Sequence, residues 1–246
     1  MAGSAAIMTK RLWAIGDLHL GFSTGKWMDK FGDNWKQHHL KVEASWSQRV
    51  ASEDIVLLPG DFSWAMRIDD VAEDFRWLQT LPGKKVLIKG NHDYWWPRSK
   101  KKMTAVLPPD TYAMKKTALV LDGVPIVGVR GGDFYPLRGE DPERVAKELE
   151  KEQREFRLSV EHLQTLGDFE RPIVAMFHYP PFPPQSDRSV FTDLIEAAGC
   201  KTVVYGHLHS QEDWDDFFQG DARGVTYHLT SCDALNFEPL LIDEWE

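Results

Sequence analysis

Cysteine is scarce in this sequence of 246 residues, which contains only Cys200 and Cys232. Two cysteines that lie far from each other cannot form the disulfide framework of a small secreted protein. We therefore expect a reducing environment and a cytoplasmic location. Nothing in the sequence around either cysteine would activate its thiol, so both are predicted to be unreactive core residues.

Long hydrophobic runs are also lacking. No apolar stretch approaches the roughly 20 residues of a membrane-spanning helix, and no signal-peptide core precedes the first apolar run. We predict a protein without a membrane partner, folded as one domain over residues 1–246, because this length can bury a substantial core. Residues 1–7 are interpreted as a tag or a disordered extension, since Met8 is a second plausible start.

Basic residues are fewer than acidic residues in this sequence. The chain has 29 Lys and Arg residues against 38 Asp and Glu residues, a formal net charge of −9. A protein that mainly coats nucleic acid needs a basic surface, so nucleic acid is a possible partner but not a favoured one. The densest positive run is "RSKKKM", residues 98–103. It could be a solvated helix start or a contact for an anionic substrate.

Short apolar runs alternate with amphipathic segments, which is typical of an α/β protein. Strands are predicted near residues 12–15, 55–58, 84–88, 173–177, 202–205, 224–232 and 239–245, and a β-hairpin is predicted about Asp122 and Gly123. Helices are predicted over 34–50, after Asp69, over 141–166 and over 192–199. The long third helix should begin with Asp141 as its N-cap and Pro142 at its first position.

Five of the apolar runs end in polar residues. They read "LWAIGDLH", "IVLLPGD", "VLIKGNHD", "IVAMFHYP" and "TVVYGHLH", and four of the five change character at a glycine, which permits a sharp turn and a close backbone approach. In α/β sheets, sites lie beyond the carboxyl ends of the strands. We therefore expect the following side chains to converge: Asp17, His19, Asp61, Asn91, His92, His178, His207 and His209.

Carboxylate, imidazole and amide groups are ligands of divalent metal ions. Eight such groups are too many for one tetrahedral ion and suit two ions that share a bridge. The set contains no thiolate, so manganese, iron, zinc and cobalt all remain open as the metal. Each histidine taken alone could be an ordinary polar residue at a strand end. The five blocks in this order favour a metal centre instead.

These five blocks resemble the calcineurin-like metallophosphoesterase superfamily. Its pattern is Asp-x-His, Gly-Asp, Gly-Asn-His-Asp/Glu, His and Gly-His-x-His, and this chain has all five blocks in order between Asp17 and His209. The sequence looks closest to the small bacterial phosphohydrolases of the superfamily. The resemblance implies a four-layer α/β/β/α sandwich of the metallo-dependent phosphatase type, in which two sheets pack together with helices outside.

The resemblance also implies a role for each matching residue. Asp17, His19 and His209 would bind a first ion, and Asn91, His178 and His207 would bind a second. Asp61 would bridge the two ions. His92 would be the catalytic histidine that contacts or protonates the reacting phosphoryl group, and Asp93 would support it.

The implied activity is hydrolysis of small phosphomonoesters or phosphodiesters by attack of metal-bound hydroxide. Two alternatives stay open. A metal-dependent nuclease would need a basic groove beside the metals, and a non-catalytic interaction module that keeps the fold would be expected to lack ligands or the catalytic histidine. The sequence does not indicate the physiological substrate or the oligomeric state.

Loops near the motifs offer candidate substrate contacts. Arg130 could hold a phosphate, and Trp95 and Tyr135 could stack on a base or an aryl group. Weaker candidates of the same kinds are Trp96, Phe134, Arg138 and Phe182. The plainer interpretation is that these aromatic residues pack loops onto the body of the protein. The remaining histidines, namely His38, His39, His162 and His228, are predicted to lie on helix or strand surfaces.

Overall fold

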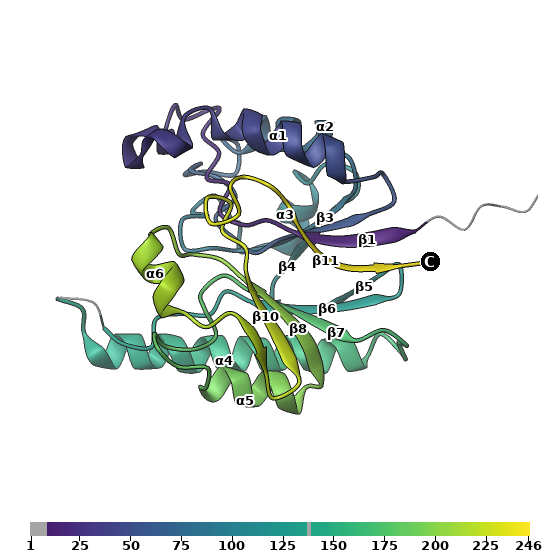
Figure 1. The fold of residues 1–246 in the computed structure, drawn as a ribbon, viewed down its shortest axis with the longest axis vertical. Helices are drawn as coiled ribbons and strands as arrows, with labels where there is room; N and C mark the ends of the chain where they lie inside the picture. The colour runs from purple at the N-terminus through teal and green to yellow at the C-terminus, as the bar shows by residue number, and fades with distance from the viewer. Residues whose placement is uncertain (1–8, 137–138) are drawn as a thin grey trace, which may run out of the picture.

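Two β-sheets face each other in the computed structural model, which describes residues 9–136 and 139–246 (Figure 1). The first sheet has five strands in the order β11-β1-β2-β3-β4. Its strands are β1 (Lys10–Ala14), β2 (Ile55–Leu58), β3 (Lys84–Ile88), β4 (Thr111–Met114) and β11 (Leu240–Trp245). Strands β1 to β4 are mutually parallel and β11 is antiparallel to β1. Two predictions concern residues outside the described ranges: the candidate substrate contact Arg138, and the tag or extension at residues 1–7.

The second sheet has six strands in the order β5-β6-β7-β8-β10-β9. They are β5 (Leu119–Leu121), β6 (Val124–Val129), β7 (Ile173–Phe177), β8 (Cys200–Tyr205), β9 (Gly220–Ala222) and β10 (Val225–Leu229). Strands β6, β7, β8 and β10 are parallel. The carboxyl ends of β6, β7 and β8 therefore lie along one edge of this sheet.

Helices cover the outer face of each sheet (Figure 1). Over the first sheet lie α1 (His38–Arg49), α2 (Ala72–Thr80) and the short α3 (Lys100–Thr104); over the second lie α4 (Pro142–Gln164) and α5 (Val190–Ala197). A further short helix, α6 (Gln211–Asp216), follows β8, and two 3-10 turns, η1 (Met28–Phe31) and η2 (Asp33–Trp35), precede α1. The predicted four-layer α/β/β/α sandwich is confirmed. None of the helices in the described part of the chain is long and apolar enough to cross a membrane.

Strands buried on both faces explain the continuous apolar runs in the sequence. Along β1, Leu12 and Ala14 pack between the two sheets, whereas Trp13 packs with the helices above the first sheet. Side chains of a strand alternate between faces, so a strand covered on both sides is apolar at every position. The core between the sheets is completed by residues such as Leu57, Val86, Ile126, Met176 and Val204.

Local sequence signals set several element boundaries. The Asp141 carboxylate accepts a hydrogen bond from the Glu143 backbone N–H at 3.0 Å, and Pro142 is the first residue of α4, as predicted. The predicted hairpin is formed by β5 and β6, with Leu121 paired to Val124. The helix predicted over 34–50 begins later, at His38, because η2 and a left-handed residue 37 (φ 52°) come first.

The surface assignment of His38 is wrong. This residue is buried, and its Nε2 lies 2.8 Å from the backbone oxygen of Leu18, so it fixes the segment that follows β1. His162 is half-buried and its Nδ1 accepts the backbone N–H of Ala118 at 3.0 Å. The periodicity of a helix shows which face is apolar, but it does not show that a polar residue has a buried partner.

Candidate metal centre

The polar residues predicted to converge do so at the carboxyl ends of five strands. Strands of the first sheet deliver the residues after β1, β2 and β3, and strands of the second sheet deliver the residues after β7 and β8. The first sheet gives Asp17, His19, Asp61, Asn91 and His92, and the second gives His178, His207 and His209. The centre therefore lies where the ends of the two sheets meet.

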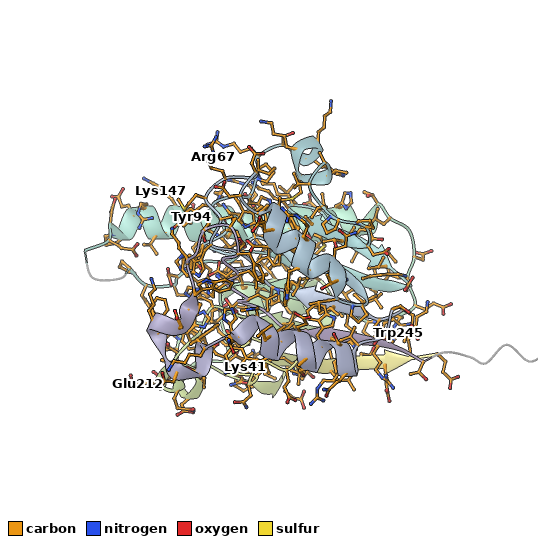
Figure 2. The ribbon with its side chains drawn as sticks, turned by 90° about the horizontal axis from the view of Figure 1, so that it is seen from above. Lys41, Arg67, Tyr94, Lys147, Glu212 and Trp245 are labelled. Atoms are coloured by element: carbon orange, nitrogen blue, oxygen red, sulfur yellow. The ribbon has the colours of Figure 1, made fainter. Side chains whose placement is uncertain are left out.

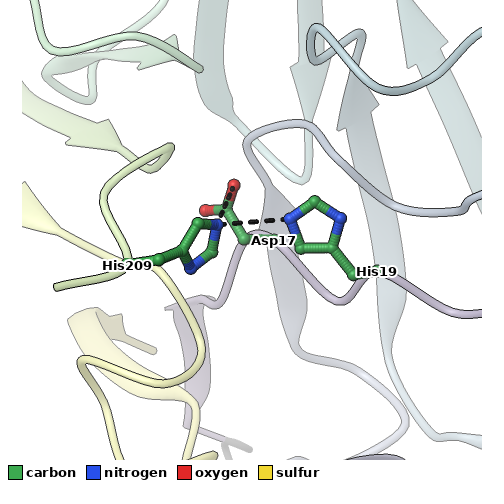
Figure 3. A group of neighbouring side chains, drawn as sticks. All are labelled: Asp17, His19 and His209. Carbon is green, nitrogen blue, oxygen red and sulfur yellow. Dashed lines mark hydrogen bonds and ion pairs between the residues drawn. The ribbon is translucent and has the colours of Figure 1, made fainter. Parts of the chain in front are cut away.

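Asp17, His19 and His209 form one group that could hold a metal ion (Figure 3). The Nε2 atoms of His19 and His209 are 3.2 Å apart. The Nε2 of His209 is 3.9 Å from Asp17 Oδ1. These three side chains come from the first sheet and from the loop after β8, and their polar atoms face one point.

A second group contains Asp61 and His178 and again includes Asp17. Asp61 Oδ2 lies 3.6 Å from the Nε2 of His178 and 3.6 Å from the Nε2 of His19, so it stands between the two groups. Asn91 Oδ1 is 2.5 Å from His178 Nε2 and 3.1 Å from His207 Nδ1. All seven predicted ligand positions are thus brought together.

The backbone of the centre is held in an unusual conformation. Asp17, His19, Asp61 and His207 have left-handed φ angles of 55°, 44°, 49° and 77°. Such conformations are uncommon for residues other than glycine and cluster at functional sites. Close packing also explains two of the glycines: a Cβ on Gly90 would overlap Asp61, and a Cβ on Gly206 would overlap Asp17.

Burial dominates the electrostatics of the centre. Desolvation raises the pKa of Asp17 above its usual range and that of Asp61 to about 6. Desolvation lowers the pKa of His19 and His207, and it lowers that of His178 to about 3. Within the described residues, no Lys or Arg side chain forms an ion pair with either carboxylate. Buried carboxylates without a Lys or Arg partner, beside three imidazoles whose pKa values burial lowers, fit divalent cations, which would supply positive charge.

Outer hydrogen bonds fix how two of the histidines point. His178 Nδ1 lies 3.1 Å from the backbone oxygen of Pro59, and His209 Nδ1 lies 3.0 Å from Asp233 Oδ1. Each contact leaves Nε2 directed into the centre, which is how proteins orient metal-binding histidines. Burial lowers the pKa of His209, but the Asp233 hydrogen bond and the charge of Asp17 outweigh it and raise the pKa to about 9.

Asp233 was missed by sequence reasoning. It follows β10 and is buried, and the only signal was a polar segment, "TSCD", at the end of a strand. Trp64 was missed as well. Its ring stacks on His19 with a centroid separation of 4.8 Å and lies 4.6 Å from the ring of His92. A tryptophan shortly after a Gly-Asp pair gives no sign of this placement in the sequence.

His92 lies beside the centre. Its backbone N–H donates to Asp61 Oδ1 at 2.8 Å, and its ring centroid is 5.7 Å from that of His19. Asp93 is buried and accepts hydrogen bonds from the backbone N–H groups of Gly90 and Phe62 at 2.8 and 3.0 Å. Asp93 therefore joins the loop after β2 to the loop after β3. Burial, with the Asp61 charge, raises the pKa of Asp93 to about 7.

The predicted substrate contacts differ in how exposed their side chains are. Trp95 is only 2% exposed, and its Nε1 donates to Asp93 at 2.9 Å, so it packs inside the protein and offers no face to a substrate. Trp96 and Phe182 are buried too, whereas Phe134 is partly exposed. Tyr135 is 65% exposed. Burial thus supports the packing interpretation for both tryptophans.

Two clefts adjoin the centre. The polar cleft, of about 340 Å³, is lined by residues that include Asn91, Tyr94, Arg130, Asp133, Arg144 and Tyr179. The apolar cleft, of about 310 Å³, shares Asp133 and Tyr179 with it and reaches His207 and Tyr135. Arg130 forms ion pairs with Glu148 and Glu152 of α4, so its charge is partly neutralised.

A family model described as calcineurin-like phosphoesterase matches residues 10–211 of this chain. The matched range begins in β1, ends at the start of α6 and contains all seven positions of the centre. The expected resemblance is therefore confirmed over most of the sequence.

Curated relatives match over a shorter stretch. The Gene 66 proteins of Mycobacterium phages L5 and D29 are 30% identical over 81 residues and 34% identical over 86 residues. Each alignment covers 33% of this chain, and the two cover 39% and 40% of the phage proteins. The matched part thus spans about two fifths of the length of these relatives.

Solved structures match along almost the whole chain. A protein of unknown function from Aquifex aeolicus, AQ665, is 14% identical with a TM-score of 0.50, covering 94% of this chain and 95% of that one. The phosphopantetheinyl hydrolase PptH from Mycobacterium tuberculosis is 16% identical with a TM-score of 0.54, covering 95% and 96%. At these identities the likeness shows a shared fold.

Proposed function

Because this chain belongs to the calcineurin-like phosphoesterase family, we propose that it hydrolyses small phosphomonoesters or phosphodiesters with two divalent metal ions. The family makes it a metal-dependent phosphoester hydrolase. The observation that carries the more specific proposal is the position of Asp61, whose Oδ2 lies 3.6 Å from both His19 and His178. A carboxylate between two groups of ligands suits a bridge between two ions.

In this proposal Asp17, His19 and His209 hold one ion, and Asn91, His178 and His207 hold the other. Manganese, iron, zinc and cobalt are all compatible with oxygen and nitrogen ligands without thiolate. Bound divalent ions would supply positive charge that attracts a phosphate, and would lower the pKa of a water molecule between them. Imidazoles that bind a metal ion are neutral, as is the Asn91 amide, so only the two carboxylates would reduce that charge.

The remaining roles belong to side chains around the ligands. His92 donates a proton to the oxygen of the leaving group, and its backbone bond to Asp61 holds it at the centre. Asp93 positions His92 by joining the loop after β2, which carries Asp61, to the loop after β3. Arg130, which lines the polar cleft next to Asn91, contacts an anionic part of the substrate.

A nuclease is the second candidate. One observation favours it: a cleft of about 280 Å³ near α3 is lined by Arg98, Lys100, Lys115 and Lys116, which is a local basic surface in an acidic chain. The non-catalytic alternative is less favoured, because all the ligand positions and His92 are present and converge.

A panel of substrates tests these functions. Protein stripped with a chelator should be inactive, and added manganese or a similar ion should restore hydrolysis. The panel should contain phosphomonoesters, phosphodiesters, oligonucleotides and a phosphopantetheinyl ester, the last because of the name of the structural neighbour. Full activity in a sample verified to be metal-free would contradict the proposal. Metal binding without turnover of any panel member would support the non-catalytic alternative.

A further inference from the structure

We propose that the apolar cleft beside His207 binds an uncharged apolar or aromatic substituent of the substrate phosphate. This substituent is the one that stays bonded to the phosphate after hydrolysis, and the other substituent leaves as an alcohol. The preferred substrate would then be a phosphodiester with one apolar arm. This inference rests on the proposed phosphoesterase function and names its substrate class.

The cleft is built from loops after neighbouring strands. Residues 132–135 follow β6, residues 179–184 follow β7, and residues 207–208 follow β8, with α6 as the last wall. Because these three strands are adjacent and parallel, their following loops lie side by side at the edge where the metal centre is. A ligand in this cleft therefore touches His207, one of the residues of the centre.

Apolar and aromatic groups make up most of the walls. They include Phe134, Tyr135, Pro183, Pro184, Leu208 and Phe217. Tyr135 is 65% exposed, so an apolar ligand would remove a large ring surface from water, which favours binding. Three of the lining residues are prolines, which restrict the backbone of the loop after β7.

One side of the apolar cleft is held in place by contacts within the protein. Tyr179 lies over His207 with ring centroids 4.0 Å apart and forms the side next to the metal centre. Trp214 of α6 donates from Nε1 to the backbone oxygen of Leu208 at 3.0 Å, and the Gln185 backbone N–H donates to the backbone oxygen of Asp216 at 2.7 Å. These bonds hold α6 against the loops after β7 and β8, so this side of the cleft needs little ordering when a ligand enters.

Charge decides which kind of group fits. Among the described residues, the charged side chains that line the apolar cleft are Asp133 and Asp213, and none of the lining residues is a Lys or Arg. A second anionic group would be repelled there, because no cation offsets these carboxylates, whereas the polar cleft has Arg130 and Arg144 beside its carboxylates Asp133, Glu140 and Glu148. The apolar cleft therefore suits an uncharged group, and it does not suit the next phosphate of a polynucleotide.

The position of His92 decides which alcohol occupies the cleft. His92 comes from the first sheet and lies against Trp64 and His19, and none of these three residues lines the apolar cleft. A leaving group must lie next to its proton donor. The group in the apolar cleft is therefore the ester that remains on the phosphate when the other P–O bond breaks.

Binding provides a test that does not need turnover. Phenylphosphonate and methylphosphonate have no ester bond, and calorimetry can measure their affinity for manganese-loaded protein. Phenylphosphonate should bind about tenfold more tightly, because only its ring can fill the cleft. Tyr135→Ala should remove most of this difference and leave methylphosphonate unchanged. Phe31→Ala is the matched control, because Phe31 is 60% exposed and lines neither cleft.

Kinetics then separates the two proposals. Phenyl p-nitrophenyl phosphate and methyl p-nitrophenyl phosphate share a leaving group, and the phenyl ester should have a KM about tenfold lower with a similar kcat. Equal affinities for the two phosphonates, or a ratio that Tyr135→Ala does not change, would overturn the inference while hydrolysis could continue. If no substrate is hydrolysed but phenylphosphonate still binds about tenfold more tightly than methylphosphonate, the proposed function is contradicted and the cleft assignment is supported.

Discussion

The two sheets contribute different chemistry to the same centre. The first sheet supplies both carboxylates, the amide and His92, and Asp17, His19 and Asp61 are at most 2% exposed. The second sheet supplies only imidazoles, and the side chain of His209 is 29% exposed. The loops after β2 and β3 are tied together by the buried Asp93, whereas the loops after β6, β7 and β8 enclose the apolar cleft.

This difference separates two tasks within one site. A buried, anionic half is suited to holding cations, because its carboxylates have little competing solvent. A half that contributes only imidazoles to the centre and whose loops enclose the apolar cleft is suited to recognising the organic part of a substrate. Substitutions in the first half should therefore damage metal binding and chemistry, and substitutions in the loops of the second half should mainly change which substrates bind.

The largest effect is expected from Asp61→Asn, at the point where the two halves meet. The change removes the charge shared by both proposed ions, so kcat/KM should fall by roughly 10⁴-fold or more. Elemental analysis should show a loss of metal together with the loss of activity. Asp168→Asn, an exposed carboxylate elsewhere, is the matched control. A variant that keeps both metals and most of its activity would show that Asp61 is no bridge.

His92→Ala should affect turnover more than metal content, because His92 contributes to the first half without being a proposed ligand. We expect kcat to fall by roughly 10²–10⁴-fold, the usual contribution of a positioned proton donor. The fall should be smaller for an aryl phosphate, whose leaving group needs little protonation. If elemental analysis instead shows that one metal is lost, His92 is a ligand and its proposed role is wrong.

Asp233→Asn should weaken only the ion held by Asp17, His19 and His209. Asp233 touches the outer nitrogen of His209 and no other histidine of the centre within the described residues, so metal affinity should fall by roughly 10–100-fold. Excess metal should restore most of the activity, which distinguishes a positioning role from a collapsed fold. The control Asp215→Asn changes an exposed carboxylate on α6. Activity that no metal concentration restores would count against this assignment.

The smallest effect is expected from replacing Lys100, Lys101 and Lys102 by Gln. Lys100 lines the basic cleft near α3, so KM for an oligonucleotide should rise a few-fold and its salt dependence should weaken. A singly charged aryl diester should be almost unaffected. The same change at Lys26, Lys30 and Lys36 is the control for net charge. Lys147, an exposed residue of α4 that is labelled in Figure 2 and does not line the basic cleft, gives a control with a single substitution. Unchanged KM and salt slope would remove the main support for a nuclease.

The sequence was most informative where one short segment carries both the structure and the chemistry. In "VLIKGNHD" the apolar run forms β3, the glycine permits contact with Asp61, and the polar residues follow directly. The location of the centre could therefore be predicted from residues that are adjacent in the sequence. The order of the strands in the second sheet could not be predicted in this way, since β10 pairs with β8 although α6 and β9 separate them in the chain.

Features that depend on the folded surroundings of a side chain were predicted poorly. In the sequence Trp95 and Tyr135 look equally suited to stacking. In the structure Trp95 is buried and donates a hydrogen bond to Asp93, whereas Tyr135 is exposed to solvent. Asp233 meets His209 across 24 positions of the chain, and its role follows only from β10 lying beside β8. Residue type and periodicity do not contain that information.

The position of the centre between the sheets also concerns stability. Each proposed ion takes ligands from both sheets: Asp17 and His19 with His209, and Asn91 with His178 and His207. A bound ion would then be a non-covalent cross-link between two layers that otherwise meet through an apolar interface. Binding to the folded chain alone would stabilise it by about 2.7 kcal/mol per site at a free metal concentration of 100 times Kd. Its melting temperature should then rise with metal concentration.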